Sequence, residues 1–166
     1  RPHLVGHSMG GEISANCATE FDLARSLVIL DSGFISNGGA FRGSAEDAEE
    51  RIARSREAVL KMRALGLEGL LARVERENPH WHPEERQPWA ESKLQVSPEY
   101  GRFFAQEKRP WQEILGAILA PILLMVAEPH LGSHTQWEAA VQATGIWQDG
   151  MLVHIPGAGH LGRGLR

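Results

Sequence analysis

Short apolar runs alternate along the chain with segments in which apolar residues recur at helical intervals. Four runs favour buried strands: residues 3–5, 26–31, 120–128 and 150–157. Between them, residues 10–20 and 133–144 have the periodicity of helices that pack on one face. The run at 26–31 (SLVILD) is apolar through its centre, as in a parallel strand that is buried on both faces. The alternation predicts an α/β fold, with a parallel sheet and flanking helices.

The middle of the chain has a different pattern, in which helical periodicity continues without strand-like runs. Residues 46–77 favour helix, and we expect Gly66 and Gly69 to divide this segment in two. Three prolines prevent one continuous helix beyond it: Pro79, Pro83 and Pro88. The helical segment is therefore an insertion between two strands of the sheet.

These patterns divide the chain into three zones. We expect core structure over residues 1–33, an inserted helical cap over residues 34–112, and core structure again over residues 113–166. Parallel α/β sheets keep their sites at the carboxyl ends of the strands. The cap is therefore expected to lie over those ends.

Composition and charge narrow the class of protein. The 166 residues suit one domain with a sizeable core, or a piece of a larger one. The formal net charge is −4 and no block of Lys and Arg stands out, which argues against a nucleic-acid partner. No apolar run approaches the roughly 20 residues that cross a bilayer, so we expect no membrane partner and a cytoplasmic location. The single cysteine, Cys17, is expected to be a buried thiol.

One serine lies between glycines where the first strand meets the first helix, in Gly6-His7-Ser8-Met9-Gly10. A Gly-x-Ser-x-Gly turn at such a junction forces the serine into a strained conformation that exposes its hydroxyl. Gly6 and Gly10 are expected to lack side chains because the turn drives strand and helix together. The first N–H groups of the helix point toward the same place. Ser8 is therefore the candidate nucleophile.

A serine needs a base, and the base needs an orienting acid. In this architecture the chain order is serine, acid, histidine. His160 follows the last predicted strand, where a loop could carry its imidazole back to Ser8, and Gly157 and Gly159 would allow a close approach. His160 is therefore the candidate base.

Together these motifs resemble the C-terminal part of an α/β-hydrolase-fold enzyme with a cap. "LVGHSMGG" resembles the nucleophile elbow, "APILLMVAEP" the strand that leads to the acid loop, and "VHIPGAGH" the loop of the histidine. The resemblance implies that strands before the elbow, and a loop with one of two oxyanion-hole donors, are missing here. We therefore expect a fragment, whose partner is the missing N-terminal part of the same fold. Only the N–H of Met9 remains as an oxyanion donor.

The acid is harder to assign. The family pattern G-x-x-D places His130 where the carboxylate is expected, and a histidine cannot stabilise an imidazolium. Two residues could substitute. Asp31, at the end of the 26–31 run, matches an alternative acid position of some relatives, and Glu128 lies in the usual loop, two residues early. A third possibility is that the chain has no working acid.

The resemblance implies a serine hydrolase that cleaves a small ester, lactone or related acyl substrate. Two alternatives remain: a cofactor-free haloperoxidase-like or carbon–carbon bond hydrolase, and a catalytically impaired binding protein of the same fold. No organic cofactor is implied. His80 and His82 have no carboxylate or cysteine at a matching spacing, so we expect no metal. The isolated fragment is expected to be inactive.

Overall fold

A computed structural model describes residues 1–36, 45–79, 81–106 and 108–160 of the chain. The chain divides into two compact units. Arg1–Ala40 and Lys108–Arg166 form an α/β unit, and Phe41–Glu107 form a helical unit. The helical unit begins later and ends earlier in the chain than the insertion expected at residues 34–112. His80, which was considered with His82 as a metal ligand, lies outside the described residues.

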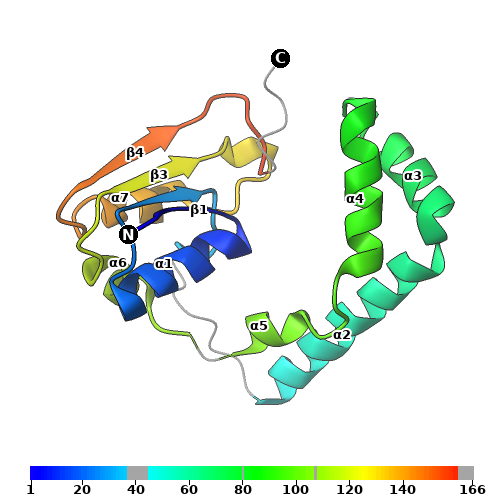
Figure 1. The fold of residues 1–166 in the computed structure, drawn as a ribbon, viewed down its shortest axis with the longest axis horizontal. Helices are drawn as coiled ribbons and strands as arrows, with labels where there is room; N and C mark the ends of the chain where they lie inside the picture. The colour runs from blue at the N-terminus through cyan, green and yellow to red at the C-terminus, as the bar shows by residue number, and fades with distance from the viewer. Residues whose placement is uncertain (37–44, 80, 107, 161–166) are drawn as a thin grey trace. The chain divides into compact units, whose positions relative to one another are not determined.

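The α/β unit is built on a parallel sheet, as the sequence predicts (Figure 1). Its strands are β1 (His3–His7), β2 (Ser26–Leu30), β3 (Ile122–Val126) and β4 (Gly150–His154). They lie side by side in chain order, β1-β2-β3-β4, and every neighbouring pair is parallel. The carboxyl ends of all four strands therefore meet at one edge, where Ser8 follows β1 and Asp31 follows β2.

Helices cover one face of this sheet. They are α1 (Met9–Phe21), α6 (Trp111–Gly116) and α7 (Trp137–Ala143), and a short 3₁₀ helix, η1 (Pro129–Leu131), follows β3. Alternate residues of the strands, such as Leu27 and Leu124, are fully buried with Ala15 of α1 and Ala140 of α7 in one apolar cluster. The small alanines let the helices pack close to the sheet.

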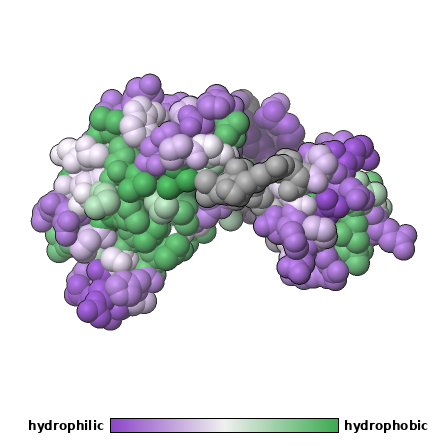
Figure 2. All heavy atoms as spheres, turned by 90° about the horizontal axis from the view of Figure 1, so that it is seen from above, coloured by the Kyte–Doolittle hydropathy of each residue, from purple (hydrophilic) through white to green (hydrophobic). Residues whose placement is uncertain are grey.

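The opposite face of the sheet presents apolar rows that are only partly buried. The register aligns Val5, Val28, Leu123 and Met151 across the four strands. The two outer members of this row are the most exposed, with Val5 at 65% and Met151 at 63% of their surface. Hydrophobic side chains also show on the surface of the α/β unit in the view of Figure 2 (left). An exposed apolar surface of this kind marks a contact site.

The helical unit contains α2 (Ala45–Ala64), α3 (Gly66–Glu77), α4 (Pro83–Gln95) and α5 (Gly101–Ala105). Gly66 separates α2 from α3 with a φ of 62°, as predicted, because glycine adopts that conformation without strain. The prediction for Gly69 was wrong, since that residue lies inside α3. Pro83 begins α4, whereas Pro88 lies within it. Every helix in the described ranges is too short or too polar to cross a membrane.

Candidate active site

Ser8 occupies the turn between β1 and α1. Its backbone has φ 53° and ψ −122°, a conformation that L-residues rarely adopt, as the glycine-flanked pattern predicts. The Ser8 N–H donates to the carbonyl of Leu30 at 3.0 Å, which ties the turn to the end of β2. Met9 is the first residue of α1, so its N–H has no acceptor within the helix. The positive end of the helix is therefore aimed at the serine.

The glycines around Ser8 have different roles. A Cβ on Gly6 would lie 2.2 Å from the carbonyl oxygen of Gly10, so strand and helix can meet only if Gly6 lacks a side chain. The same requirement predicted for Gly10 is wrong, because a Cβ there meets no atom within 4 Å. The second position that must lack a side chain is Gly11, since a Cβ there would lie 2.8 Å from the Cβ of Ser32. The close approach thus involves the residue after the five-residue motif.

His160 reaches Ser8 from the far end of the chain. Its Nε2 lies 3.0 Å from the Ser8 Oγ. The loop that carries it is fastened to the end of β3, because the Glu128 N–H donates to the Ala158 carbonyl at 2.8 Å. Gly157 turns this loop with a φ of 72°. The structure therefore brings together the two residues that the sequence named as nucleophile and base.

Asp31 is the carboxylate beside His160. Its Oδ2 lies 2.7 Å from the His160 Nδ1, and the residue is only 4% exposed. Its second oxygen, Oδ1, accepts a hydrogen bond from the Ser133 hydroxyl at 2.5 Å. The backbone N–H groups of His134 and Thr135 donate to the carboxylate at 2.9 and 3.2 Å. The loop after β3, where a family acid was expected, here supplies donors to an acid on β2.

These contacts keep Asp31 ionised. Burial raises its pKa, but the hydrogen bonds from Ser133, from the His134 N–H, from His160 and from the Thr135 N–H lower it by more, to about 2. A carboxylate can only accept, so Nδ1 of His160 carries the proton that joins the pair. When the His160 ring is neutral, its Nε2 therefore carries no proton and accepts the hydrogen bond of the Ser8 hydroxyl.

Glu128, the other acid candidate, has different partners. Its carboxylate lies 3.4 Å from the His130 Nδ1 and 3.5 Å from the His154 Nε2. It also accepts a hydrogen bond from the Gly157 N–H at 3.5 Å. Glu128 thus contacts the loop that carries His160, while the imidazole of His160 pairs with Asp31.

Sequence reasoning missed the roles of Ser32, Thr135 and His134 at the site. Ser32 is buried, and its hydroxyl donates to the carbonyl of Ser8 in a short hydrogen bond, while the Thr135 hydroxyl donates to the Ser32 carbonyl at 3.1 Å. The Nε2 of His7 lies 2.6 Å from the His160 carbonyl and donates to it. His134 stacks on the ring of His160. Spacing alone gives no signal for these residues, because each acts across two or more loops.

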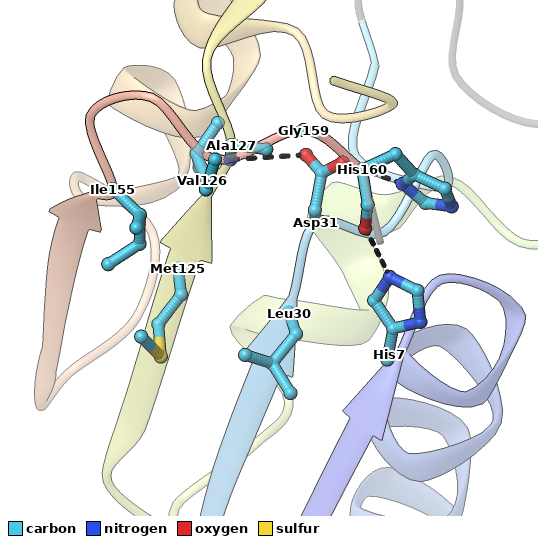
Figure 3. A pocket seen from close by; sticks show the side chains of 10 residues that line it. His7, Leu30, Asp31, Met125, Val126, Ala127, Ile155, Gly159 and His160 are labelled. Atoms are coloured by element: carbon cyan, nitrogen blue, oxygen red, sulfur yellow. Dashed lines mark hydrogen bonds and ion pairs between the residues drawn. The ribbon is translucent and has the colours of Figure 1, made fainter. Parts of the chain in front are cut away.

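A cavity of about 330 Å³ lies beside this cluster, and Asp31 and His160 are among the residues that line it. Figure 3 shows Leu30 and Met125 on neighbouring strands, with Asp31 and His160 at the carboxyl ends. The lining is mostly apolar: His7, Leu30, Asp31, Met125, Val126, Ala127, Ile155, Ala158, Gly159 and His160. Leu30 and Met125 belong to the face of the sheet that lies opposite the helices.

Comparison with known proteins shows the family to which the chain belongs. A family model described as "Alpha/beta hydrolase family" matches residues 1–164. The chain belongs to the α/β hydrolase family. No curated protein matches the chain in sequence.

Solved structures share the α/β hydrolase fold at low identity. The E-2-(acetamidomethylene)succinate hydrolase is 20% identical with a TM-score of 0.63, over 96% of this chain and 60% of that one. An N-formylmaleamic acid deformylase from Pseudomonas putida S16 is 18% identical with a TM-score of 0.61, over 96% and 60%. The esterase EaEST from Exiguobacterium antarcticum is 17% identical with a TM-score of 0.61, over 95% and 59%. The chain thus spans about 60% of the length of these α/β hydrolases.

Proposed function

We propose that this chain carries the Ser-His-acid centre of a serine hydrolase that cleaves a small ester, lactone or related acyl substrate. The observation that carries the proposal is the continuous hydrogen-bonded path from the Ser8 hydroxyl through His160 to the Asp31 carboxylate. The contacts of Asp31 keep it ionised, and the tautomer of His160 with its proton on Nδ1 leaves Nε2 free to accept one. Esterase and hydrolase neighbours of the same fold agree with this class of reaction.

The first half of the reaction acylates the serine. The Ser8 Oγ attacks the substrate carbonyl carbon while its proton passes to the His160 Nε2. Asp31 stabilises the imidazolium that forms. The new oxyanion accepts a hydrogen bond from the Met9 N–H at the positive end of α1, and a second donor comes from outside these residues. The tetrahedral species then collapses, and the leaving alkoxide takes the proton from His160 and departs as an alcohol.

The second half regenerates the enzyme. A water molecule gives a proton to the His160 Nε2 as its oxygen attacks the acyl carbon of the ester on Ser8. Collapse of this second tetrahedral species breaks the bond to the Ser8 Oγ, which recovers its proton from His160. An ester gives one carboxylic acid and one alcohol, a lactone gives one hydroxy acid, and the sequence of steps needs no external electron donor or acceptor.

The acid distinguishes this proposal from an impaired binding protein. The binding alternative depends on the absence of a working carboxylate, because a histidine replaces the usual acid at position 130. Asp31 favours an enzyme, since it is buried, ionised and 2.7 Å from the His160 Nδ1. The haloperoxidase-like and carbon–carbon bond hydrolases use the same serine and histidine, so they differ from an esterase in substrate and not in these residues.

The direct test is labelling with a fluorophosphonate, which reacts with an activated serine hydroxyl. In the complete protein we expect one label per chain at Ser8, its loss in Ser8→Ala, and slower labelling in His160→Ala. A panel of p-nitrophenyl esters, lactones and carbon–carbon substrates would then separate the reaction classes. Labelling that persists in Ser8→Ala, or an unlabelled protein at every pH from about 6 to 9, contradicts the proposal.

We also propose that the helical unit serves as the cap that shapes the substrate site. Its support is its place in the chain, since residues 41–107 are inserted between β2 and α6 of the α/β unit. In the complete protein, replacement of residues 41–107 by a short linker is expected to raise KM for longer acyl esters more than for acetates. An unchanged preference for chain length argues against the cap role.

A further inference from the structure

The ring of His134 lies directly against the ring of His160. The two centroids are 3.4 Å apart and the planes differ by 21°, so the imidazoles are stacked. His134 belongs to the loop between η1 and α7, and it is an exposed residue outside every motif of the family. Its contact with the candidate base therefore calls for a physical explanation.

The backbone of His134 holds the acid of the same path. Its N–H donates to Oδ2 of Asp31 at 2.9 Å, and this same oxygen accepts the hydrogen bond of the His160 Nδ1. One residue thus fixes the carboxylate through its main chain and touches the imidazole through its side chain. The backbone contact survives any substitution except proline, so the side chain can be tested alone.

We propose that His134 is a positioning residue for His160, whose ring it holds by stacking so that Nε2 stays aimed at the Ser8 hydroxyl. The inference rests on the proposed function, since it assigns His134 to the reaction of that site. Without the stack, the His160 ring would keep its two edge contacts, to Asp31 and to Ser8, and a tilted contact with the His7 ring at 4.7 Å between centroids. A ring that rotates about these contacts spends less time in the reactive geometry, and small misplacements of this kind lower rates strongly.

The charges around His134 favour a neutral ring. Burial of part of the ring lowers its pKa, and positive charge on His160 and on His7 lowers it further, while the Asp31 carboxylate opposes this shift. Within the described residues, the charged partners that shift the pKa of His134 are His160, His7 and Asp31. When His160 becomes an imidazolium, it lies on the face of a neutral aromatic ring and not beside a second cation.

Three substitutions of His134 distinguish the effect of its aromatic ring from the effect of its protonation. His134→Phe keeps a flat aromatic ring that cannot be protonated, whereas His134→Ala and His134→Gln remove the ring and keep the backbone N–H. We expect His134→Phe to retain kcat within about threefold, and both ring-less variants to lose about tenfold or more in kcat with little change in KM. His130→Ala is the matched control, because His130 is an exposed histidine of the same segment whose ring faces Glu128.

The readouts are steady-state kinetics on a p-nitrophenyl ester and the rate of fluorophosphonate labelling in the complete protein. Melting temperatures of all variants show whether each is folded. The change in kcat without a change in KM, together with the rescue by His134→Phe, distinguishes a positioning role from a loss of stability. Equal activity of the wild type and His134→Ala overturns the inference, as does a His134→Phe variant as slow as His134→Ala. If the Ser8→Ala variant is still labelled, the proposed function itself is wrong, and this result is distinct from a failure of the His134 inference alone.

Discussion

The Asp31 Oδ2 and the His160 Nδ1 lie 2.7 Å apart although the two residues are separated by 129 positions in the chain. Asp31 is at the carboxyl end of β2, one strand away from Ser8, while His160 follows β4 at the opposite edge. The loop between β4 and His160 must therefore pass back over the end of β3 to close this contact. The bond between the Glu128 N–H and the Ala158 carbonyl holds it there.

This relationship leads to a prediction about the acid. Asp31→Asn should keep the size of the side chain but lose the charge that stabilises the imidazolium, and it should favour the wrong tautomer of His160. We expect kcat/KM on a p-nitrophenyl ester to fall on the order of 10⁴-fold.

The control for the acid is Glu128→Gln. It changes the other candidate carboxylate, whose partners are His130, His154 and the Gly157 N–H and not the imidazole of His160, and it should alter kcat/KM by about threefold or less. A variant Glu128→Gln that is as slow as Asp31→Asn, or an Asp31→Asn enzyme of full activity, would show that the structure's pairing is not the one used in the reaction.

Most of the core could be predicted from the sequence, and so could the nucleophile and the base of the proton path. The strands and the Ser8 elbow have local patterns, namely apolar runs and flanking glycines, that depend only on neighbours in the chain. His160 could be named because it follows the last apolar run.

The choice of acid could not be predicted, because it depends on donors that come from another loop. Ser133 and the backbone of His134 fix Asp31, and neither lies near it in the chain. Residues 133–135 had the pattern of a helix start. In the structure α7 begins only at Trp137, since residues 133–135 form a loop that donates hydrogen bonds to Asp31. The sequence predicted close packing at Gly10, whereas the structure has it at Gly11. This difference has a similar cause, because it depends on where Ser32 lies.

The pKa of Asp31 predicts how stability depends on pH. Its folded value of about 2 is below its ordinary value of 3.8, so the unfolded chain binds the proton more readily between these values. The carboxylate therefore stabilises the fold above about pH 4, and this stabilisation is lost as the pH falls through about 2. From the difference in pKa, about 2 kcal/mol should be lost between pH 5 and pH 2.

Urea unfolding of the wild type and Asp31→Asn at several pH values measures this contribution. The difference between their free energies of unfolding should shrink by that amount as the pH falls, because the asparagine has no proton to gain. A difference that stays constant from pH 5 to pH 2 would mean that Asp31 is not ionised in the way its contacts require.

The elbow glycines make a prediction about packing. Gly6→Ala places a methyl group against the backbone of Gly10 and should destabilise the fold by about 3 kcal/mol or more, since backbone cannot move aside easily. Gly11→Ala meets a serine side chain and should also be destabilising. Gly10→Ala should be neutral or stabilising by up to about 1 kcal/mol, because its Cβ lies in open space. The midpoints of urea unfolding rank the three variants, and a Gly10→Ala chain less stable than Gly6→Ala would contradict the geometry.

The exposed row across the sheet makes the last prediction. Val5 and Met151 end a row of apolar residues that the described helices leave open, and such a surface binds hydrophobic dyes or further polypeptide. We propose that the natural partner of this face is further polypeptide of the same hydrolase fold, since the chain spans about 60% of the length of the solved α/β hydrolases.

The 166-residue chain alone should therefore bind 8-anilinonaphthalene-1-sulfonate and self-associate in sedimentation experiments. Val5→Lys and Met151→Lys together should reduce both signals, because lysine keeps its charge in water on an exposed strand. Leu119→Lys is the control, since Leu119 is equally exposed, at 69%, but lies before β3 and outside the row. Equal loss of dye binding in the control and the double variant would show that the row is not the binding surface.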